Sequence, residues 1–119
     1  MEFLENQPIY MQIADVFCEN ILLQKWKINE RIPSVRDVAV QMEVNPNTAM
    51  RAFVYLQEKE IIFNKRGIGY FVSEDGYRKA LELRRADFIE KDLPVVMKTM
   101  KLLDITCSEM EELYQQKYE

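Results

Sequence analysis

Three polar side chains near the middle of the sequence have the types and spacing needed to bind the edges of nucleic-acid bases. In the stretch VNPNTAMRAF, residues 44–53, Asn47, Thr48 and Arg51 fall on one arc when residues are placed at about 100° intervals. An amide and a guanidinium can each make paired hydrogen bonds to a base, and a hydroxyl can bind a phosphate. A second interpretation is that Asn47 and Thr48 only satisfy free N–H groups at the start of a helix.

Further candidates lie nearer the N-terminus. Arg36 occurs in the segment PSVRDVAVQM, away from its apolar residues, where a guanidinium can pair with guanine O6 and N7 or bind a phosphate. Ser34 and Tyr10 are candidate phosphate donors at the edge of such a site. A helix-capping Ser and a packed Tyr explain these two residues almost as well.

A basic segment follows in IIFNKRGIGYFV, where two β-branched and aromatic runs flank NKRG. This pattern predicts a β-hairpin whose strands are residues 61–63 and 68–72. Lys65 and Arg66 would lie at its tip and could line a minor groove. Gly67 and Gly69 would let the backbone approach a sugar-phosphate chain, although the turn alone also favours glycine.

Three helices are expected before the hairpin, and they would hold these side chains in place. Apolar residues spaced three and four apart predict a first helix over residues 8–24. Ser34 as N-cap, with Asp37 as its capping-box partner, predicts a short second helix. Asn45 as N-cap predicts a third helix that ends near Lys59. The apolar arc of this third helix consists of Ala49, Ala52, Phe53 and Leu56. The turn between the last two helices has the length found in helix-turn-helix units.

The composition limits the chemistry that the chain can perform. Its 119 residues are 48% hydrophobic and 30% charged with 3 Gly, which is typical of one helix-rich globular domain or a domain with a small appendage. The sequence has no His, which excludes His-dependent metal sites and Ser-His-Asp or Cys-His catalytic groups. Cys18 and Cys107 form no C-x-x-C motif and are expected to be reduced thiols. We therefore expect that the protein binds no metal ion and no cofactor and that it is not an enzyme.

The charge balance argues mildly against nucleic acid. The formal net charge is −4, and residues 1–73 hold 8 Lys and Arg against 9 Asp and Glu. Phosphate binding depends on where the cations lie, so a local basic patch would still suffice. No apolar run approaches the roughly 18 to 20 residues of a membrane span, and the acidic start MEFLENQP is unlike a signal peptide. A cytoplasmic protein without membrane contact is expected.

Residues 74–119 form long, charged and helical sequence with apolar stripes that too few neighbours can cover. A second copy of the chain would cover them, because symmetric dimers are the commonest soluble oligomers. Met97, Met100 and Met110 are expected at that interface, and Trp26 in the core. The tail contains no polar cluster that predicts a small-molecule effector site, so an effector stays unassigned.

Several separated motifs resemble one protein family. PIYMQI, IPSVRDVAVQMEVNPNTAMRAFVYLQEKEII and GIGYFV are similar, in order and spacing, to the N-terminal domain of GntR-type bacterial transcription regulators over residues 8–72. VNPNT and the short helical tail resemble the YtrA-like subfamily, which implies a dimeric regulator, often of transporter operons. The resemblance also implies that Arg36, the Arg of PSxR, contacts DNA. The chain departs from the broader family at Pro46 and Met50, where many relatives carry Arg, so the operator cannot be inferred from them.

These features predict a mainly α-helical protein with a small β-hairpin. Residues 1–73 would form a winged helix-turn-helix DNA-binding domain, and residues 74–119 a helical dimerisation domain. The predicted function is that of a homodimeric regulator, a repressor in the simplest case, which binds a pseudo-palindromic operator in double-stranded DNA. The alternative is a winged-helix module that binds other proteins without sequence-specific DNA binding. The predicted DNA-binding residues are Ser34, Arg36, Asn47, Thr48, Arg51, Lys65, Arg66, Gly67 and Gly69.

Overall fold

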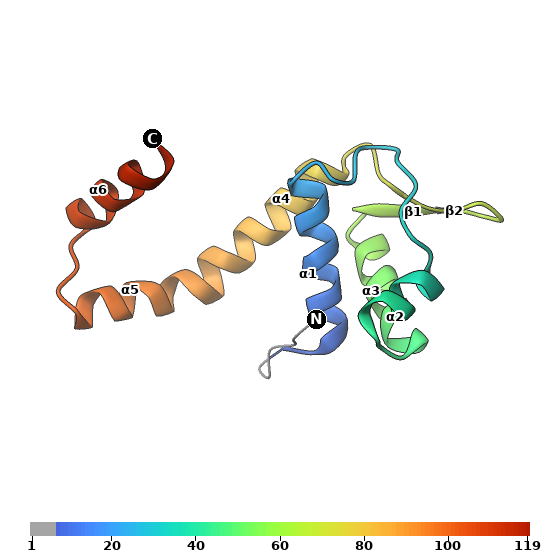
Figure 1. Ribbon diagram of the computed structural model, residues 1–119, viewed down its shortest axis with the longest axis horizontal. Coiled ribbons are helices and arrows are strands. Elements are labelled where there is room, and N and C mark those ends of the chain that lie inside the picture. Colours follow the sequence, from blue (N-terminus) through green and yellow to red (C-terminus); the bar gives the residue numbers. More distant parts are fainter. Residues whose placement is uncertain (1–6) are drawn as a thin grey trace. The chain divides into compact units, whose positions relative to one another are not determined.

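The computed structural model describes residues 7–119, and Figure 1 labels its α-helices and strands. In chain order they are α1 (Ile9–Leu22), α2 (Val35–Met42), α3 (Pro46–Glu58), β1 (Ile62–Lys65), β2 (Gly69–Val72), α4 (Gly76–Asp87), a π-helix η1 (Phe88–Asp92), α5 (Leu93–Leu102) and α6 (Cys107–Tyr118). The predicted fold class, mainly helical with one hairpin, is confirmed. The chain divides into two compact units, one ending at Arg84 and one formed by residues 85–119. Residues 1–6, part of the predicted first domain and of the segment compared with signal peptides, lie outside the described residues.

The helix-turn-helix forms because capping side chains define where α2 and α3 begin. The backbone N–H of Asp37 donates to Ser34 Oγ at 3.1 Å, and the backbone N–H of Ser34 donates to Asp37 Oδ2 at 3.4 Å. This is the predicted capping box. After α2 the backbone turns at Glu43, whose φ of 55° is left-handed, and Asn45 then caps α3. The connection from residue 43 to 45 has the length expected for this motif.

The core of the first unit lies between α3 and the two helices that pack against it, α1 and α2. Phe53 of α3 is fully buried, with its ring centroid 5.1 Å from that of Phe17 and 4.7 Å from that of Tyr70. Phe17 also contacts Trp26 edge-on at 4.9 Å, which confirms the core assignment of Trp26. The four residues predicted for the apolar arc of α3 are all buried, namely Ala49, Ala52, Phe53 and Leu56.

The hairpin forms where predicted, but its turn lies one residue later in the chain than predicted. The register pairs Ile62 with Val72 and Lys65 with Gly69, so the turn is Lys65–Ile68 rather than the predicted Asn64–Gly67. Ile68 N–H donates to the carbonyl of Lys65 at 2.9 Å, and Gly67 has a φ of +80°. A type II turn requires such a φ at its third residue, which explains why the turn centres on this glycine.

The hairpin also gains an edge that the sequence analysis did not predict. Residues 29–32 run along β2, where Ile32 N–H donates to the Tyr70 carbonyl at 2.9 Å. Val72 N–H donates to the carbonyl of Glu30 at 3.0 Å. This edge connects the segment before α2 to the hairpin β1–β2, which is called the wing below. The wing and the helix-turn-helix therefore belong to one compact unit.

The second unit consists of the end of α4, η1, α5 and α6. The π-helix comes just before Pro94, which has no N–H to donate to the carbonyl four residues earlier. α6 is capped by Thr106, whose Oγ1 accepts a hydrogen bond from the N–H of Glu109 at 3.1 Å. In the single chain no residue of α5 or α6 is buried. Their exposed large apolar residues are Val95, Val96, Met97, Leu102, Met110, Leu113, Tyr114 and Tyr118.

The beginning of α4 packs closely against Ile61 and Val72 within the first unit. Gly76 is buried, and a Cβ added to it would lie 2.8 Å from the carbonyl oxygen of Ile61 and 2.8 Å from Cγ1 of Val72. Ala80, one helical turn further on, is fully buried as well. The first compact unit therefore includes Gly76 and Ala80 of α4 and ends at Arg84.

We expect Gly76→Ala to lower the free energy of unfolding by about 1–3 kcal/mol, because the new methyl group cannot avoid backbone and a buried side chain. Urea titration followed by far-UV circular dichroism measures this change. Glu74→Ala is the control, since an exposed neighbouring substitution should change stability by less than about 0.5 kcal/mol. Equal stability of the Gly76→Ala variant and the wild type would contradict the close packing described here.

Candidate nucleic-acid interface

The polar face of α3 is exposed and its side chains are not used to cap the helix. The backbone N–H of Asn47 donates to Asn45 Oδ1 at 2.8 Å, and that of Thr48 donates to the carbonyl of Asn45 at 2.9 Å. Asn45 therefore satisfies the free N–H groups that the second interpretation had assigned to Asn47 and Thr48, and that interpretation is wrong. The side chains of Asn47 and Thr48 form no hydrogen bond with other residues in the range 7–119.

Arg51 lies on the same exposed face, one turn after Asn47. Its guanidinium carbon lies over the ring of Tyr10, 4.2 Å from the ring centroid. The structure gives this guanidinium no hydrogen bond or ion pair within residues 7–119. Its N–H donors are therefore available to a ligand. Tyr10, for which the sequence left open a phosphate donor or a packed ring, is half-buried and packs against the core.

The start of α2 adds two of the predicted residues. Ser34 is the N-cap, so its oxygen already accepts one hydrogen bond, while its hydroxyl proton remains a possible donor. Arg36 is exposed in the first turn of α2, and no carboxylate of the described chain pairs with it. A helix N-terminus with a free guanidinium is a favourable place for a phosphate group.

The residues predicted to contact DNA from the wing lie in different parts of the hairpin. Arg66 and Gly67 lie in the exposed turn, and a Cβ added to Gly67 would meet no atom within 4 Å. Lys65 belongs to β1, and its ammonium lies 4.7 Å from the ring centroid of Phe71. A Cβ on Gly69 would lie only 3.0 Å from Nε of Arg31. The space beside Gly69 therefore accommodates Arg31, a cation that the sequence analysis did not single out.

Arg31 could not be recognised from the sequence because its position depends on the unpredicted edge. It pairs with Phe71 across an isolated β-bridge, and these two residues are far apart in the chain. The only local signal was a basic residue just before the IPS motif. The structure thereby brings another exposed cation to the wing.

The negative net charge was an argument against nucleic-acid binding, and the ion pairs of the first 73 residues bear on it. The Lys and Arg residues of this segment are Lys25, Lys27, Arg31, Arg36, Arg51, Lys59, Lys65 and Arg66. None of these eight forms an ion pair with another residue of the range 7–119. Because their charges are not neutralised internally, they can interact with phosphates.

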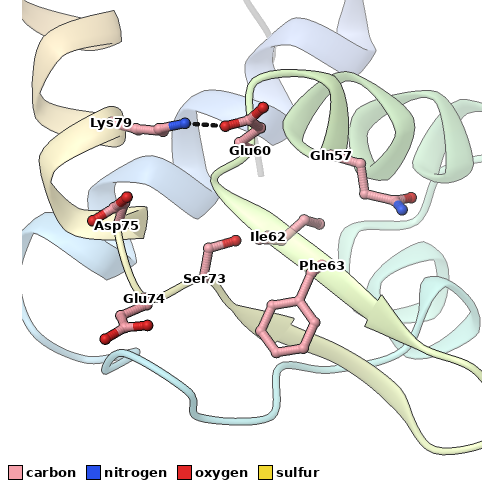
Figure 2. A pocket seen from close by; sticks show the side chains of 8 residues that line it. All are labelled: Gln57, Glu60, Ile62, Phe63, Ser73, Glu74, Asp75 and Lys79. Carbon is pink, nitrogen blue, oxygen red and sulfur yellow. Dashed lines mark hydrogen bonds and ion pairs between the residues drawn. The ribbon is translucent and has the colours of Figure 1, made fainter.

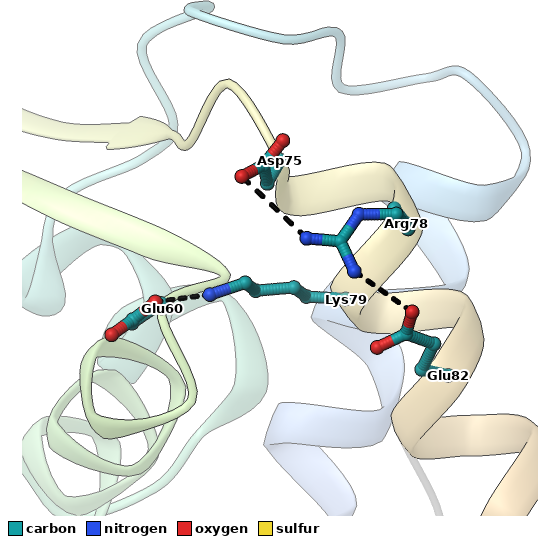
Figure 3. Close-up of polar contacts among 5 residues, drawn as sticks. All are labelled: Glu60, Asp75, Arg78, Lys79 and Glu82. Atoms are coloured by element: carbon teal, nitrogen blue, oxygen red, sulfur yellow. Dashed lines mark hydrogen bonds and ion pairs between the residues drawn. The ribbon is translucent and has the colours of Figure 1, made fainter.

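Two acidic residues of the same segment are instead paired with cations of α4. Lys79 bonds to Glu60, as Figure 3 shows, and this hydrogen bond lowers the pKa of the Glu60 carboxyl from its ordinary value. Arg84 pairs with Asp15 at 2.7 Å. Arg78 pairs within α4 and its N-terminal turn, with Glu82 at 2.8 Å and Asp75 at 3.6 Å. Two carboxylates of residues 1–73 are thus neutralised by cations of α4, where no DNA contact is predicted.

A hollow of about 380 Å³ lies beside these ion pairs (Figure 2). It is lined by Gln57, Glu60, Ile62, Phe63, Ser73, Glu74, Asp75 and Lys79. Three carboxylates against one ammonium repel a phosphate backbone, and no predicted DNA-binding residue lines this hollow. Within residues 7–119 no three His, Cys, Asp or Glu residues cluster in a way that could hold a metal ion. Among the helices described, none combines the length and the apolar character needed to cross a bilayer.

Comparisons with known proteins agree with this geometry. The model of the family described as bacterial regulatory proteins, gntR family, matches residues 9–72. The uncharacterized HTH-type transcriptional regulator YhcF of Bacillus subtilis (strain 168) is 32% identical over 111 residues, which cover 93% of this chain and 90% of YhcF. The HTH-type transcriptional repressor YtrA of the same organism is 35% identical over 77 residues, which cover 65% of this chain and 59% of YtrA.

A solved structure extends the likeness to the fold of nearly the whole chain. The crystal structure of a protein from Bacteroides thetaiotaomicron assigned to the GntR family of transcriptional regulators has a TM-score of 0.72 and 41% sequence identity. The match covers 91% of this chain and 94% of that protein. The relatives and the fold are those of transcription regulators and not of enzymes. The chain therefore belongs to the GntR family of bacterial transcription regulators, and its winged helix-turn-helix is a DNA-binding domain.

Proposed function

We propose that the protein is a homodimeric repressor that reads a pseudo-palindromic operator with the exposed face of α3. The observation that carries this proposal is the state of that face: Asn47 and Arg51 are exposed, and their side chains have no hydrogen-bonding partner in residues 7–119. A helix that enters a major groove needs such free groups to pair with base edges. Because the proposed target is bacterial chromosomal DNA, the protein would act in the cytoplasm.

The remaining predicted residues are proposed to bind the sugar-phosphate backbone or the minor groove. Thr48 and Ser34 have hydroxyl groups near helix N-termini, where a phosphate is favoured. Arg36 is proposed to pair with a guanine or a phosphate at the start of α2. On the wing we assign the same kind of contact to a group of four residues: Lys65, Arg66, Gly67 and Gly69. The open space around Gly67 supports a close approach of the DNA backbone at that point.

Dimerisation is proposed to use residues 74–119, and in particular α5 and α6. In one chain these helices expose large apolar side chains such as Leu102, Leu113 and Tyr118. Burial of each such side chain is favourable by about 1.5–3 kcal/mol, and a second copy would provide the missing surface. Two copies would present two α3 helices to successive major grooves, which matches a pseudo-palindromic site. Repression is proposed because YtrA is named a repressor and because a bound dimer blocks a promoter.

We expect Arg51→Ala to lower affinity for the operator by about 1–3 kcal/mol and to reduce the preference over random DNA, because a guanidinium on a base edge is lost. An operator is first selected from a random pool of duplexes. Fluorescence anisotropy then measures binding of wild type and variant to the operator and to a random duplex at two salt concentrations.

Arg85→Ala is the matched control, because it removes an exposed arginine outside the first compact unit. It should keep the wild-type preference for the operator. If Arg51→Ala discriminates between the two duplexes as well as the wild type does, Arg51 has no role in reading bases. A wild-type protein that binds both duplexes equally would favour the protein-interaction alternative.

We expect a chain that ends at Arg84 to sediment as a monomer, whereas the full chain should sediment as a dimer. The shortened chain keeps the first compact unit, including Ala80, and lacks the apolar surfaces of α5 and α6. Thermal unfolding followed by circular dichroism verifies that it still folds cooperatively.

A pair of substitutions in the full chain provides a matched control for this experiment. Leu113→Lys places a charge among the apolar residues of α6 and should weaken the dimer, while Glu112→Lys changes a neighbouring polar position and should not. A dimer that survives both the truncation and Leu113→Lys would refute the assignment of the interface to this segment.

A further inference from the structure

We propose that Tyr10 is a positioning residue for DNA recognition, in which its aromatic ring holds the Arg51 guanidinium ready to pair with a base. This proposal rests on the proposed function, because it assigns Arg51 to base reading. It adds a residue of α1, a helix outside the helix-turn-helix itself, to the determinants of sequence specificity.

The geometry of the pair is that of a cation–π interaction. The guanidinium carbon of Arg51 lies over the Tyr10 ring at 4.2 Å from the centroid, well inside the roughly 6 Å at which such pairs attract each other. Tyr10 comes from the first turn of α1, and Arg51 from the middle of α3. Both residues belong to the first compact unit, so the contact is formed within that unit.

The ring itself is held in place by its neighbours. Tyr10 is half-buried and meets the ring of Tyr55 edge-on, with centroids 6.3 Å apart. The start of α1 is anchored by the Nε2 of the buried Gln12, which donates to the carbonyl of Gln7 at 2.8 Å. Gln7 in turn donates from Nε2 to Asp15 at 3.1 Å. A ring fixed in this way can restrict a long side chain that would otherwise sample many rotamers.

An aromatic partner suits this purpose better than a carboxylate. A carboxylate would accept the same N–H donors that a guanine O6 and N7 require, whereas a ring contacts the guanidinium face and leaves the donors in its plane free. Glu58 lines the same hollow of about 280 Å³ as Tyr10 and Arg51, yet it forms no ion pair with Arg51. The guanidinium is thereby oriented without being neutralised.

The ring, and not the hydroxyl, carries this role, which separates the proposal from a phosphate contact by the Tyr10 oxygen. Tyr10→Phe keeps the ring and Tyr10→Leu removes it. We expect Tyr10→Phe to bind the selected operator within about twofold of the wild type. We expect Tyr10→Leu to reduce the ratio of operator to random-duplex affinity by roughly 2- to 30-fold, the range that a cation–π contact implies.

A double-variant cycle tests whether Tyr10 acts through Arg51. In the Arg51→Ala background, Tyr10→Leu should cause no further loss of discrimination, because the group that it positions is absent. The affinity for random duplex and its dependence on salt should be the same for Tyr10→Leu and wild type, because phosphate contacts are unchanged. Unaltered random-duplex binding also verifies that the variant is folded.

A second measurement needs no DNA and uses the intact wild-type protein. The Arg51 δ and ε protons should show an upfield ring-current shift by NMR that persists in Tyr10→Phe. Absence of this shift in the wild type would overturn the proposal even if Tyr10→Leu failed to fold.

The outcomes distinguish this proposal from the proposed function. Equal losses in Tyr10→Phe and Tyr10→Leu would assign the effect to the hydroxyl and overturn the positioning role. Additive losses in the double variant would do the same, because Tyr10 would then act independently of Arg51. If Arg51→Ala loses discrimination while Tyr10→Leu keeps it, positioning fails and base reading by α3 stands. If the wild type itself prefers no duplex, the proposed function fails, and this proposal fails with it.

Discussion

The packing of the apolar arc of α3 against α1 is the constraint on which the rest of the first unit depends. Phe53 is fully buried among rings from α1 and from β2, so the same side chain holds both the helix bundle and the wing. With one arc of a helix fixed in a core, the opposite arc must face solvent. Asn47 and Arg51 are exposed for this reason, and a change in the core would move both of them together.

The second organising feature is the separation of paired from unpaired charges. α4 places Lys79 and Arg84 against Glu60 and Asp15, while the cations of the first 73 residues remain without carboxylate partners in the described chain. The net charge therefore does not argue against nucleic-acid binding by itself, since phosphate binding depends on where unpaired cations lie. The same ion pairs attach α4 to Asp15 of α1 and to Glu60, which follows α3.

Local signals in the sequence were sufficient to predict the helices of the DNA-binding domain. The caps at Ser34 and Asn45 are short-range features, and the apolar arc of α3 follows directly from helical periodicity. The turn of the hairpin was misplaced because both Asn64 and Gly67 favour turns, and only the pairing register decides between them. The edge formed by residues 29–32, the packing of Gly76 and the contact of Tyr10 with Arg51 are long-range features. No local pattern predicts them, because each depends on which surfaces the fold brings together.

The sequence departs from the resembled family pattern at Pro46 and Met50, where Arg is expected. The proposed contact of Arg51 with a base is therefore more important in this chain than it would be beside additional arginines. Pro46 occupies the first helical position, where its missing N–H costs nothing because an N–H at that position has no acceptor within the helix. Met50 is exposed beside Arg51 and provides an apolar surface instead of a donor. In the proposed function, α3 offers few guanidinium groups to bases, so discrimination would depend on few hydrogen bonds and would be sensitive to the misalignment of each. The role proposed for the Tyr10 ring is to hold Arg51 in place and so to limit this misalignment.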